Sequence, residues 1–310
     1  MKADGVFEGG GVKGIALIGA VAEMEEHGYV WDQLAGTSAG SIVAALLSAG
    51  YTSRELYEVF DTLDYSMFMR RTGWTRIPIV GPMYNLFWKK GLYSAHPVEE
   101  FMNGLLRKKG IRTFGDLPKE KLRIIASDIT GGQMLVLPDA LSTFGINPDT
   151  FPIAQAVRMS SSIPYFFQPA TITKDYAPHL IVDGALLSNF PVWLFDVPDR
   201  PRWPTFGFRL SEEHKVDQPA EIKGIASFSK ALLTTMLDAH DRQHIQTAHA
   251  VRTIFIPTLG VRTTQFHLSK ETRVQLYESG QNAARKFLKT WNFERYVEVF
   301  RRIPQEKMKI

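Results

Sequence analysis

The chain opens with two strand–loop–helix units, and this repetition constrains its fold more than any other feature. In the first unit, apolar residues 5–7 lead into the glycine-rich loop EGGGVKG, and apolar residues then recur at helical spacing over 15–24. In the second unit, residues 31–35 lead into GTSAG, and the small apolar residues 41–48 follow. Strands that alternate with helices predict an α/β fold with a mostly parallel sheet covered by helices on both faces.

The rest of the chain continues this alternation, with one irregular segment. Hydrophobic patterns predict further strands at 123–130, 134–137, 180–182, 205–210 and 253–256, and helices at 153–159, 224–250 and 270–291. Segment 65–93 has no clean period and mixes aromatic residues, methionine, proline and basic residues. Two interpretations of it stay open: a lid or lipid-facing surface, and an irregular cap whose aromatic side chains pack inward.

Composition excludes several classes of protein. Of the 310 residues, 45% are hydrophobic and 22% are charged, as in an ordinary globular domain. The chain has no cysteine, which excludes disulfide scaffolds, cysteine nucleophiles and thiolate metal sites. The net charge of +4 favours anionic partners only weakly, and no basic run is interleaved with stacking aromatic residues, so we expect no nucleic-acid binding. Because neither a signal peptide nor an apolar run of membrane-spanning length is visible, we expect a cytoplasmic location.

The GTSAG sequence fits the G-x-S-x-G pattern of a nucleophile elbow. In such an elbow the serine, here Ser38, stands on a tight turn between a strand and a helix. Gly36 and Gly40 permit the crowded backbone, and the helix that follows directs its N-terminal N–H groups at developing negative charge. We therefore predict that Ser38 is a nucleophile, with an ordinary Ser/Gly turn as the alternative.

The GGGVKG loop has three interpretations. It matches the G-x-G-x-x-G dinucleotide fingerprint, but the acidic residue required at the end of the next strand is missing, because Asp32 lies before or early in that strand. A structural turn is the second interpretation. The one we favour is an oxyanion-binding loop, in which Gly9, Gly10 and Gly11 present backbone N–H groups to a substrate carbonyl. Because the two loops follow successive strands, they can meet at one edge of a parallel sheet.

A serine nucleophile needs a base, and two kinds of residue are candidates. None of the eight histidines lies in a recognisable motif, although His267 has a suitable place in chain order for a hydrolase triad. His240 and His244 have a spacing that suits metal binding, but no third ligand is in view, so we expect no metal site. Asp183 follows an apolar strand and precedes Gly184, which makes it either a strand-end base or part of an Asp-Gly turn.

The three motifs, taken together and in this order, resemble the patatin-like phospholipase family. The family pattern of G-G-G-x-[KR]-G, G-x-S-x-G and D-G-[GA] is intact here as GGGVKG, GTSAG and DGA. The sequence SSSIPYFFQP at 160–169 also resembles the stretch before the family's aspartate, and the resemblance covers roughly residues 4–195. It implies a three-layer α/β/α fold, related to the catalytic domain of cytosolic phospholipase A2, and a Ser38–Asp183 dyad without histidine, metal or cofactor. The glycines expected to support these motifs are Gly14, Gly36, Gly40 and Gly184.

The resemblance further implies a serine hydrolase that acts on phospholipids, lysophospholipids or other acyl-ester lipids. Residues 4–196 are then the catalytic core and residues 197–310 complete the same domain, with peripheral membrane contact as an open alternative and no indication of oligomeric state. An acyltransferase with the same dyad, and a nucleotide-binding module built on the glycine loop, stay as alternative functions. A free aspartate, with a pKa of about 3.9, is a weak base, so we expect Asp183 to be desolvated and its pKa raised.

Overall fold

A computed structural model of the chain describes residues 1–69, 86, 88–211, 222, 231, 247–263 and 265–300. The strands in these ranges are β1 (Lys2–Phe7), β2 (Val30–Thr37), β3 (Gly91–Tyr93), β4 (Leu122–Asp128), β5 (Gln133–Leu137), β6 (Tyr165–Phe167), β7 (Ala170–Lys174), β8 (Ala177–Asp183), β9 (Thr205–Ser211) and β10 (Thr253–Pro257). The α-helices are α1 (Gly14–Glu26), α2 (Ala39–Ser48), α3 (Ser53–Asp61), α5 (His96–Lys108), α6 (Ile153–Ser160), α8 (Thr247–Ala250), α9 (Lys270–Leu288) and α10 (Phe293–Phe300).

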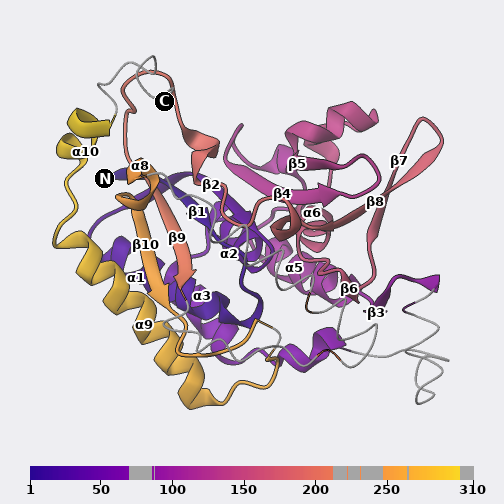
Figure 1. The fold of residues 1–310 in the computed structure, drawn as a ribbon, viewed down its shortest axis with the longest axis horizontal. Coiled ribbons are helices and arrows are strands. Elements are labelled where there is room, and N and C mark those ends of the chain that lie inside the picture. The colour runs from indigo at the N-terminus through magenta and orange to yellow at the C-terminus, as the bar shows by residue number, and fades with distance from the viewer. Residues whose placement is uncertain are drawn as a thin grey trace.

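An eight-stranded sheet is the centre of the described structure (Figure 1). Its strand order is β10-β9-β1-β2-β4-β8-β7, and β5 pairs with β4 outside this path. Neighbouring strands from β10 to β4 are parallel, whereas β5 and β8 are antiparallel to β4, and β7 is antiparallel to β8. The predicted α/β class with a mostly parallel sheet is confirmed.

Alternate residues of the central strands face two hydrophobic cores. Phe7 of β1 and Leu34 of β2 belong to the larger core, to which α1, α2 and α9 contribute their apolar side chains. Val6 and Ala35, one position away on the same strands, belong to a smaller core with Phe195 of the 3₁₀ helix η8 (Val192–Phe195). Successive side chains of a strand point to opposite faces, so both faces of the sheet are covered.

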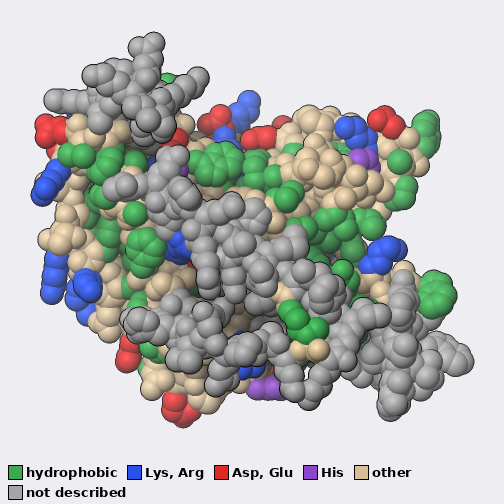
Figure 2. Space-filling model, viewed as in Figure 1, with side chains coloured by type: hydrophobic (Ala, Val, Ile, Leu, Met, Phe, Trp, Pro, Cys, Tyr) green, Lys and Arg blue, Asp and Glu red, His purple; other side chains and the backbone are tan. Residues whose placement is uncertain are grey.

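Helices α1 and α9 pack unusually close to each other, and α9 lies along α1 and β10 at the left in Figure 1. A Cβ atom at Gly19 of α1 would lie 2.0 Å from the Tyr277 carbonyl oxygen, and one at Gly280 of α9 would lie 2.0 Å from the Ala16 carbonyl oxygen. Only glycine permits this approach of two backbones. Figure 2 shows basic side chains along the same edge of the molecule, and α9 carries Arg285 in its last turn.

The junction of β2 and β8 on one edge of β4 positions the site described below. Strand β4 pairs with three strands. The β4 residues that pair with β5 overlap those that pair with β2 and those that pair with β8, so β5 occupies one edge of β4, and β2 and β8 share the other edge. Strand β2 runs parallel to β4 and ends with Thr37 opposite Ile125. Strand β8 runs the other way and ends with Asp183 opposite Ala126. The carboxyl ends of two strands therefore point at each other along a single edge.

Some predicted elements differ from the observed ones. The small parallel sheet of β3 and β6 and the hairpin strand β7 were not predicted, because strands of three to five residues carry too little periodicity. The predicted helix at 224–250 and most of segment 65–93 lie outside the described residues. At the start of that segment, Tyr65 and Phe68 are buried, whereas Trp88 near its end is 71% exposed. None of the helices in the described ranges combines the length and the hydropathy needed to span a bilayer.

Candidate active site

Ser38 occupies a strained turn between β2 and α2. Its φ of 51° and ψ of −123° are rare for a residue with a side chain, as expected of a nucleophile elbow. The two flanking glycines are required by contact: a Cβ at Gly36 would lie 2.3 Å from the Gly40 carbonyl oxygen, and one at Gly40 would lie 2.3 Å from the Phe7 carbonyl oxygen. The predicted local structure around GTSAG is therefore present.

Ser38 and Asp183 meet where β2 and β8 end. The Ser38 hydroxyl lies close enough to the Asp183 carboxyl group to lower the pKa of that group by hydrogen bonding, and both residues are buried, with exposed fractions of 6% and 3%. The turn after Asp183 needs Gly184, because a Cβ there would lie 2.3 Å from the Ile125 carbonyl oxygen. The structure thus brings together two residues that lie far apart in the sequence.

Burial raises the pKa of Asp183 to about 7. Two hydrogen bonds act in the opposite direction, one from the Ala185 N–H at 2.9 Å and one from the Ser38 hydroxyl. They do not offset the loss of water around the carboxylate. The desolvation and raised pKa predicted for a serine-activating aspartate are therefore found at this residue.

The glycine loop approaches Ser38 and contains two N–H groups without a hydrogen-bond partner in the described part of the chain. A Cβ at Gly9 would lie 3.1 Å from the Ser38 Cβ, which places this part of the loop against the Ser38 side chain. The Gly9 N–H donates to the Asn189 carbonyl oxygen at 3.3 Å. The N–H groups of Gly10 and Gly11 make no hydrogen bond to another described residue. Of the three predicted oxyanion donors, Gly9 is thus already engaged, and its close packing accounts for the glycine there.

The buried carboxylate of Glu8 anchors the glycine loop to neighbouring segments. Glu8 is 1% exposed, and its oxygens accept hydrogen bonds from the Leu210 N–H and the Asn189 side-chain amide, the latter at 3.4 Å. The Arg209 guanidinium lies 3.5 Å from the same carboxylate. Glu8 therefore ties the loop to β9 and to the segment that follows Asp183. The sequence motifs did not indicate Glu8, which directly precedes the glycine motif, or Asn189, which lies four residues after the DGA motif.

Gly11 and Gly14 differ in why glycine is present. Gly11 has a φ of 56°, and a Cβ there would lie 2.2 Å from the Thr263 carbonyl oxygen. At Gly14, the first residue of α1, an added Cβ would make only ordinary contacts beyond 3.6 Å. Space and backbone geometry therefore explain Gly11, while nothing in the structure explains Gly14.

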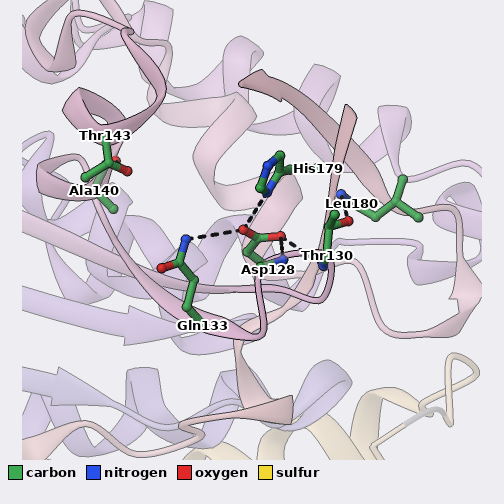
Figure 3. Close-up of polar contacts among 8 residues, drawn as sticks. Asp128, Thr130, Gln133, Ala140, Thr143, His179 and Leu180 are labelled. Carbon is green, nitrogen blue, oxygen red and sulfur yellow. Dashed lines mark hydrogen bonds and ion pairs between the residues drawn. The ribbon is translucent and has the colours of Figure 1, made fainter. Parts of the chain in front are cut away.

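A histidine–aspartate pair of β8 and β4 lies elsewhere on the sheet. The Nδ1–H of His179 in β8 donates to the Asp128 carboxylate at 2.8 Å, and the Gln133 side-chain amide donates to the same carboxylate (Figure 3). His179 stands four residues before Asp183 on the same strand, at the far side of the β4–β8 ladder. The alternative base His267 is exposed, and His240 and His244 lie outside the described residues. Ser38 therefore meets an aspartate at this site.

Comparison with known proteins agrees with this geometry. Residues 5–196, more than half of the chain, match the family described as patatin-like phospholipase. The chain belongs to the patatin-like phospholipase family. The match includes the glycine loop, Ser38 and Asp183, so the resemblance drawn from the three motifs is confirmed.

Relatives of this patatin-like chain range from a full-length match to shared domains. The uncharacterized protein YqhO of Bacillus subtilis is 44% identical over 94% of this chain and all of its own length. A lysophospholipase, NTE1 of Debaryomyces hansenii, is 27% identical over 60% of this chain but only 10% of its own length. The crystal structure of VipD from Legionella pneumophila has a TM-score of 0.57 at 16% identity, over 93% of this chain and 66% of VipD. The last two proteins are thus matched over only part of their length.

Proposed function

We propose that the protein is a serine hydrolase of acyl-ester lipids, with Ser38 as nucleophile and Asp183 as its base. The observation that carries this proposal is the approach of the Ser38 hydroxyl to a buried carboxyl group with a pKa of about 7, next to a glycine loop in which the Gly10 and Gly11 N–H groups bond to no other described residue. A carboxylate with a pKa near neutrality can both accept a proton and return it in the same catalytic cycle.

In the first half-reaction, the Ser38 oxygen attacks the ester carbonyl carbon while Asp183 takes the hydroxyl proton. The N–H groups of Gly10 and Gly11, together with the Ala39 N–H at the start of α2, stabilise the oxyanion that forms. When the carbon–oxygen bond of the ester breaks, the protonated Asp183 returns the proton to the leaving alcohol. The acyl group then remains on Ser38.

In the second half-reaction, water replaces the alcohol. Asp183 removes a proton from the water, which attacks the acyl-serine, and the fatty acid leaves as Ser38 recovers its proton. No metal or cofactor is needed for either step. An alcohol that competes with water at this stage would make the enzyme an acyltransferase, which is the second outcome of the test below.

The substrates we propose are phospholipids, lysophospholipids or related acyl-ester lipids. Family membership and the lysophospholipase among the relatives support this class. Exposed Trp88 is followed by the exposed residues Lys89 and Lys90, and an aromatic residue next to cations suits an anionic lipid surface. We therefore propose peripheral contact with a membrane from the cytoplasmic side. We also propose that residues 4–196 and 197–310 act as one catalytic domain.

The test measures acyl release from a medium-chain p-nitrophenyl ester and from lysophosphatidylcholine by wild type, Ser38→Ala and Ser48→Ala. Ser48 is a matched control, because it is a buried serine of α2 whose hydroxyl has no hydrogen-bond partner in the described structure. We expect Ser38→Ala to lose roughly a thousandfold or more of the activity and Ser48→Ala to retain it. A folded Ser38→Ala variant with wild-type turnover would overturn the proposal, and product that forms only with an added alcohol would favour acyl transfer.

A further inference from the structure

One short turn contacts the backbone of both Ser38 and Asp183. The turn comprises Ser160, Ser161 and Ser162, and it ends helix α6 next to β4 and β8 (Figure 1). At its start, the Ser160 hydroxyl accepts a hydrogen bond from the Ser38 N–H at 2.8 Å. At its end, the Ser162 carbonyl oxygen accepts one from the Asp183 N–H at 2.9 Å. The two residues that must meet are therefore held by neighbouring positions of a third segment.

The orientation of the Ser160 hydroxyl is fixed from two sides. It accepts from Ser38 and donates its proton to the Ile125 carbonyl oxygen at 2.5 Å. Ile125 is the β4 residue opposite Thr37, where β2 ends. Ser160 has no exposed surface, so water cannot replace either bond without rearrangement. This hydroxyl thus connects the strained Ser38 backbone to the central strand of the site.

The backbone N–H groups near Ser38 differ in whether they already make a hydrogen bond. The Ser38 N–H bonds to Ser160 and is not free for a substrate, whereas the N–H groups of Ala39, Gly10 and Gly11 have no such partner among the residues that the structure describes. With its N–H fixed, the φ of 51° at Ser38 directs the side chain of that residue toward Asp183. A rotation of this peptide would displace the hydroxyl from the carboxyl group.

We propose that Ser160 is a positioning residue for the nucleophile: its hydroxyl holds the Ser38 peptide in the orientation that keeps the Ser38 oxygen on Asp183. This inference rests on the proposed function of the same site. Ser160 touches neither substrate nor reacting atoms, and it acts only through the backbone of Ser38. A displacement of about 1 Å in a reacting group can cost on the order of a hundredfold in rate.

The neighbouring serine provides a matched control. Ser161 is 7% exposed, and its hydroxyl has no hydrogen-bond partner among the described residues. Ser160→Ala and Ser161→Ala therefore remove the same atom from adjacent buried positions, and only the first removes a bond to Ser38. A second pair, Ser160→Thr and Ser160→Val, has equal shape and differs by the hydroxyl alone, so it isolates the hydrogen bonds if Ser160→Ala does not fold.

The experiment measures kcat, KM and the pH dependence of kcat/KM on a p-nitrophenyl ester for these variants, together with their Tm. We expect Ser160→Ala and Ser160→Val to lower kcat by about ten- to a hundredfold with KM within about twofold of wild type, and Ser160→Thr to recover most of the loss. Ser161→Ala should match wild type. The Ser38 hydroxyl lowers the pKa of Asp183 by hydrogen bonding, and variants without a hydroxyl at position 160 should weaken this contact. In those variants the acid limb of kcat/KM should therefore move to higher pH.

A purely structural role for Ser160 would lower Tm without moving the acid limb. The inference is overturned if Ser160→Ala and Ser160→Val keep wild-type kcat, or if their acid limbs coincide with that of Ser160→Thr. Ser38→Ala, measured in parallel, separates this failure from failure of the proposed function. If Ser38→Ala is active, the proposed function is wrong; if it is inactive while Ser160→Val equals wild type, only the role of Ser160 is wrong.

Discussion

Asp128 and Asp183 end two strands that pair with each other, β4 and β8, and both side chains are buried, with exposed fractions of 0% and 3%. Burial raises the pKa of Asp183 to about 7. Burial acts on Asp128 in the same direction, but hydrogen bonds from the Gly131 N–H, His179 and Gln133 outweigh it, and the pKa of Asp128 lies below its usual value. The pKa values of two buried carboxyl groups, at opposite ends of the same β4–β8 ladder, are thus shifted in opposite directions.

The difference comes from the number of hydrogen-bond donors around each group. Asp128 accepts from the Thr130 and Gly131 N–H groups at 3.0 and 2.9 Å, and it also bonds Gln133 and His179 (Figure 3). Among the described residues, the hydrogen-bond donors to the Asp183 carboxyl group are the Ala185 N–H and the Ser38 hydroxyl. A buried carboxylate with several hydrogen-bond donors stays ionised, and at Asp128 it stabilises the hairpin. A buried carboxylate with few donors keeps its proton up to near-neutral pH. Burial alone therefore does not mark a base.

The largest expected contrast between the two aspartates is in activity. Asp183→Asn removes the proton acceptor of Ser38, so kcat/KM should fall by about a thousandfold or more, whereas Asp128→Asn should stay within about threefold of wild type. Ester hydrolysis by purified, folded variants measures both. Equal losses in the two variants would remove the functional distinction between them.

The pH dependence of wild-type activity is the next largest effect. Asp183 works as a base only when ionised, and its pKa is about 7, so kcat/KM should fall about tenfold per pH unit below that value. Between pH 7 and pH 5 the loss should be on the order of a hundredfold. Stopped assays on an uncharged ester, with Tm recorded at each pH, separate this limb from unfolding. A profile that is flat from about pH 4 to 9 would count against Asp183 as the base.

The two Asn variants should change stability with opposite signs. The pKa of Asp183 is raised on folding, so its contribution is most favourable below about pH 4 and is lost as pH rises through 7. The pKa of Asp128 is lowered on folding, so its contribution is present above about pH 4 and is lost in acid. At pH 8, Asp183→Asn should therefore stabilise the protein by about 1–3 kcal/mol, and Asp128→Asn should cost about 2 kcal/mol. Urea unfolding at pH 8 and pH 5 measures the change in the free energy of unfolding for each variant. A loss of stability in both variants at pH 8 would contradict the opposite signs expected for Asp183 and Asp128.

The smallest expected effect concerns one donor of Asp128. His179→Gln removes one hydrogen bond to the Asp128 carboxylate and should lower the free energy of unfolding by about 1 kcal/mol without changing kcat/KM. The exposed His267 serves as the control, since His267→Gln should leave both stability and activity unchanged. A large loss of activity in either variant would reopen the possibility of a histidine base.

Much of the fold near the N-terminus could be predicted from local sequence. The strand–loop–helix units, the elbow at Ser38 and the need for Gly36 and Gly40 all follow from spacing and from the space that a Cβ atom requires. The strands predicted at 123–130 and 134–137 are likewise present, as β4 and β5, which pair as an antiparallel hairpin. Short elements such as β3 and β6 were not, because their partners lie far away in the chain.

What the sequence determined by itself was the set of chemical groups and the local turns that expose them. That Asp183 followed a strand was visible, but its choice as base rested on family resemblance, since an Asp-Gly turn has the same local sequence. Only the tertiary structure decided that β2 and β8 end against each other on β4, and that Glu8 and Ser160 hold the loop and the nucleophile. The physical reason is that turns depend on nearby backbone geometry, whereas a pKa depends on burial and on donors from every segment that surrounds the group.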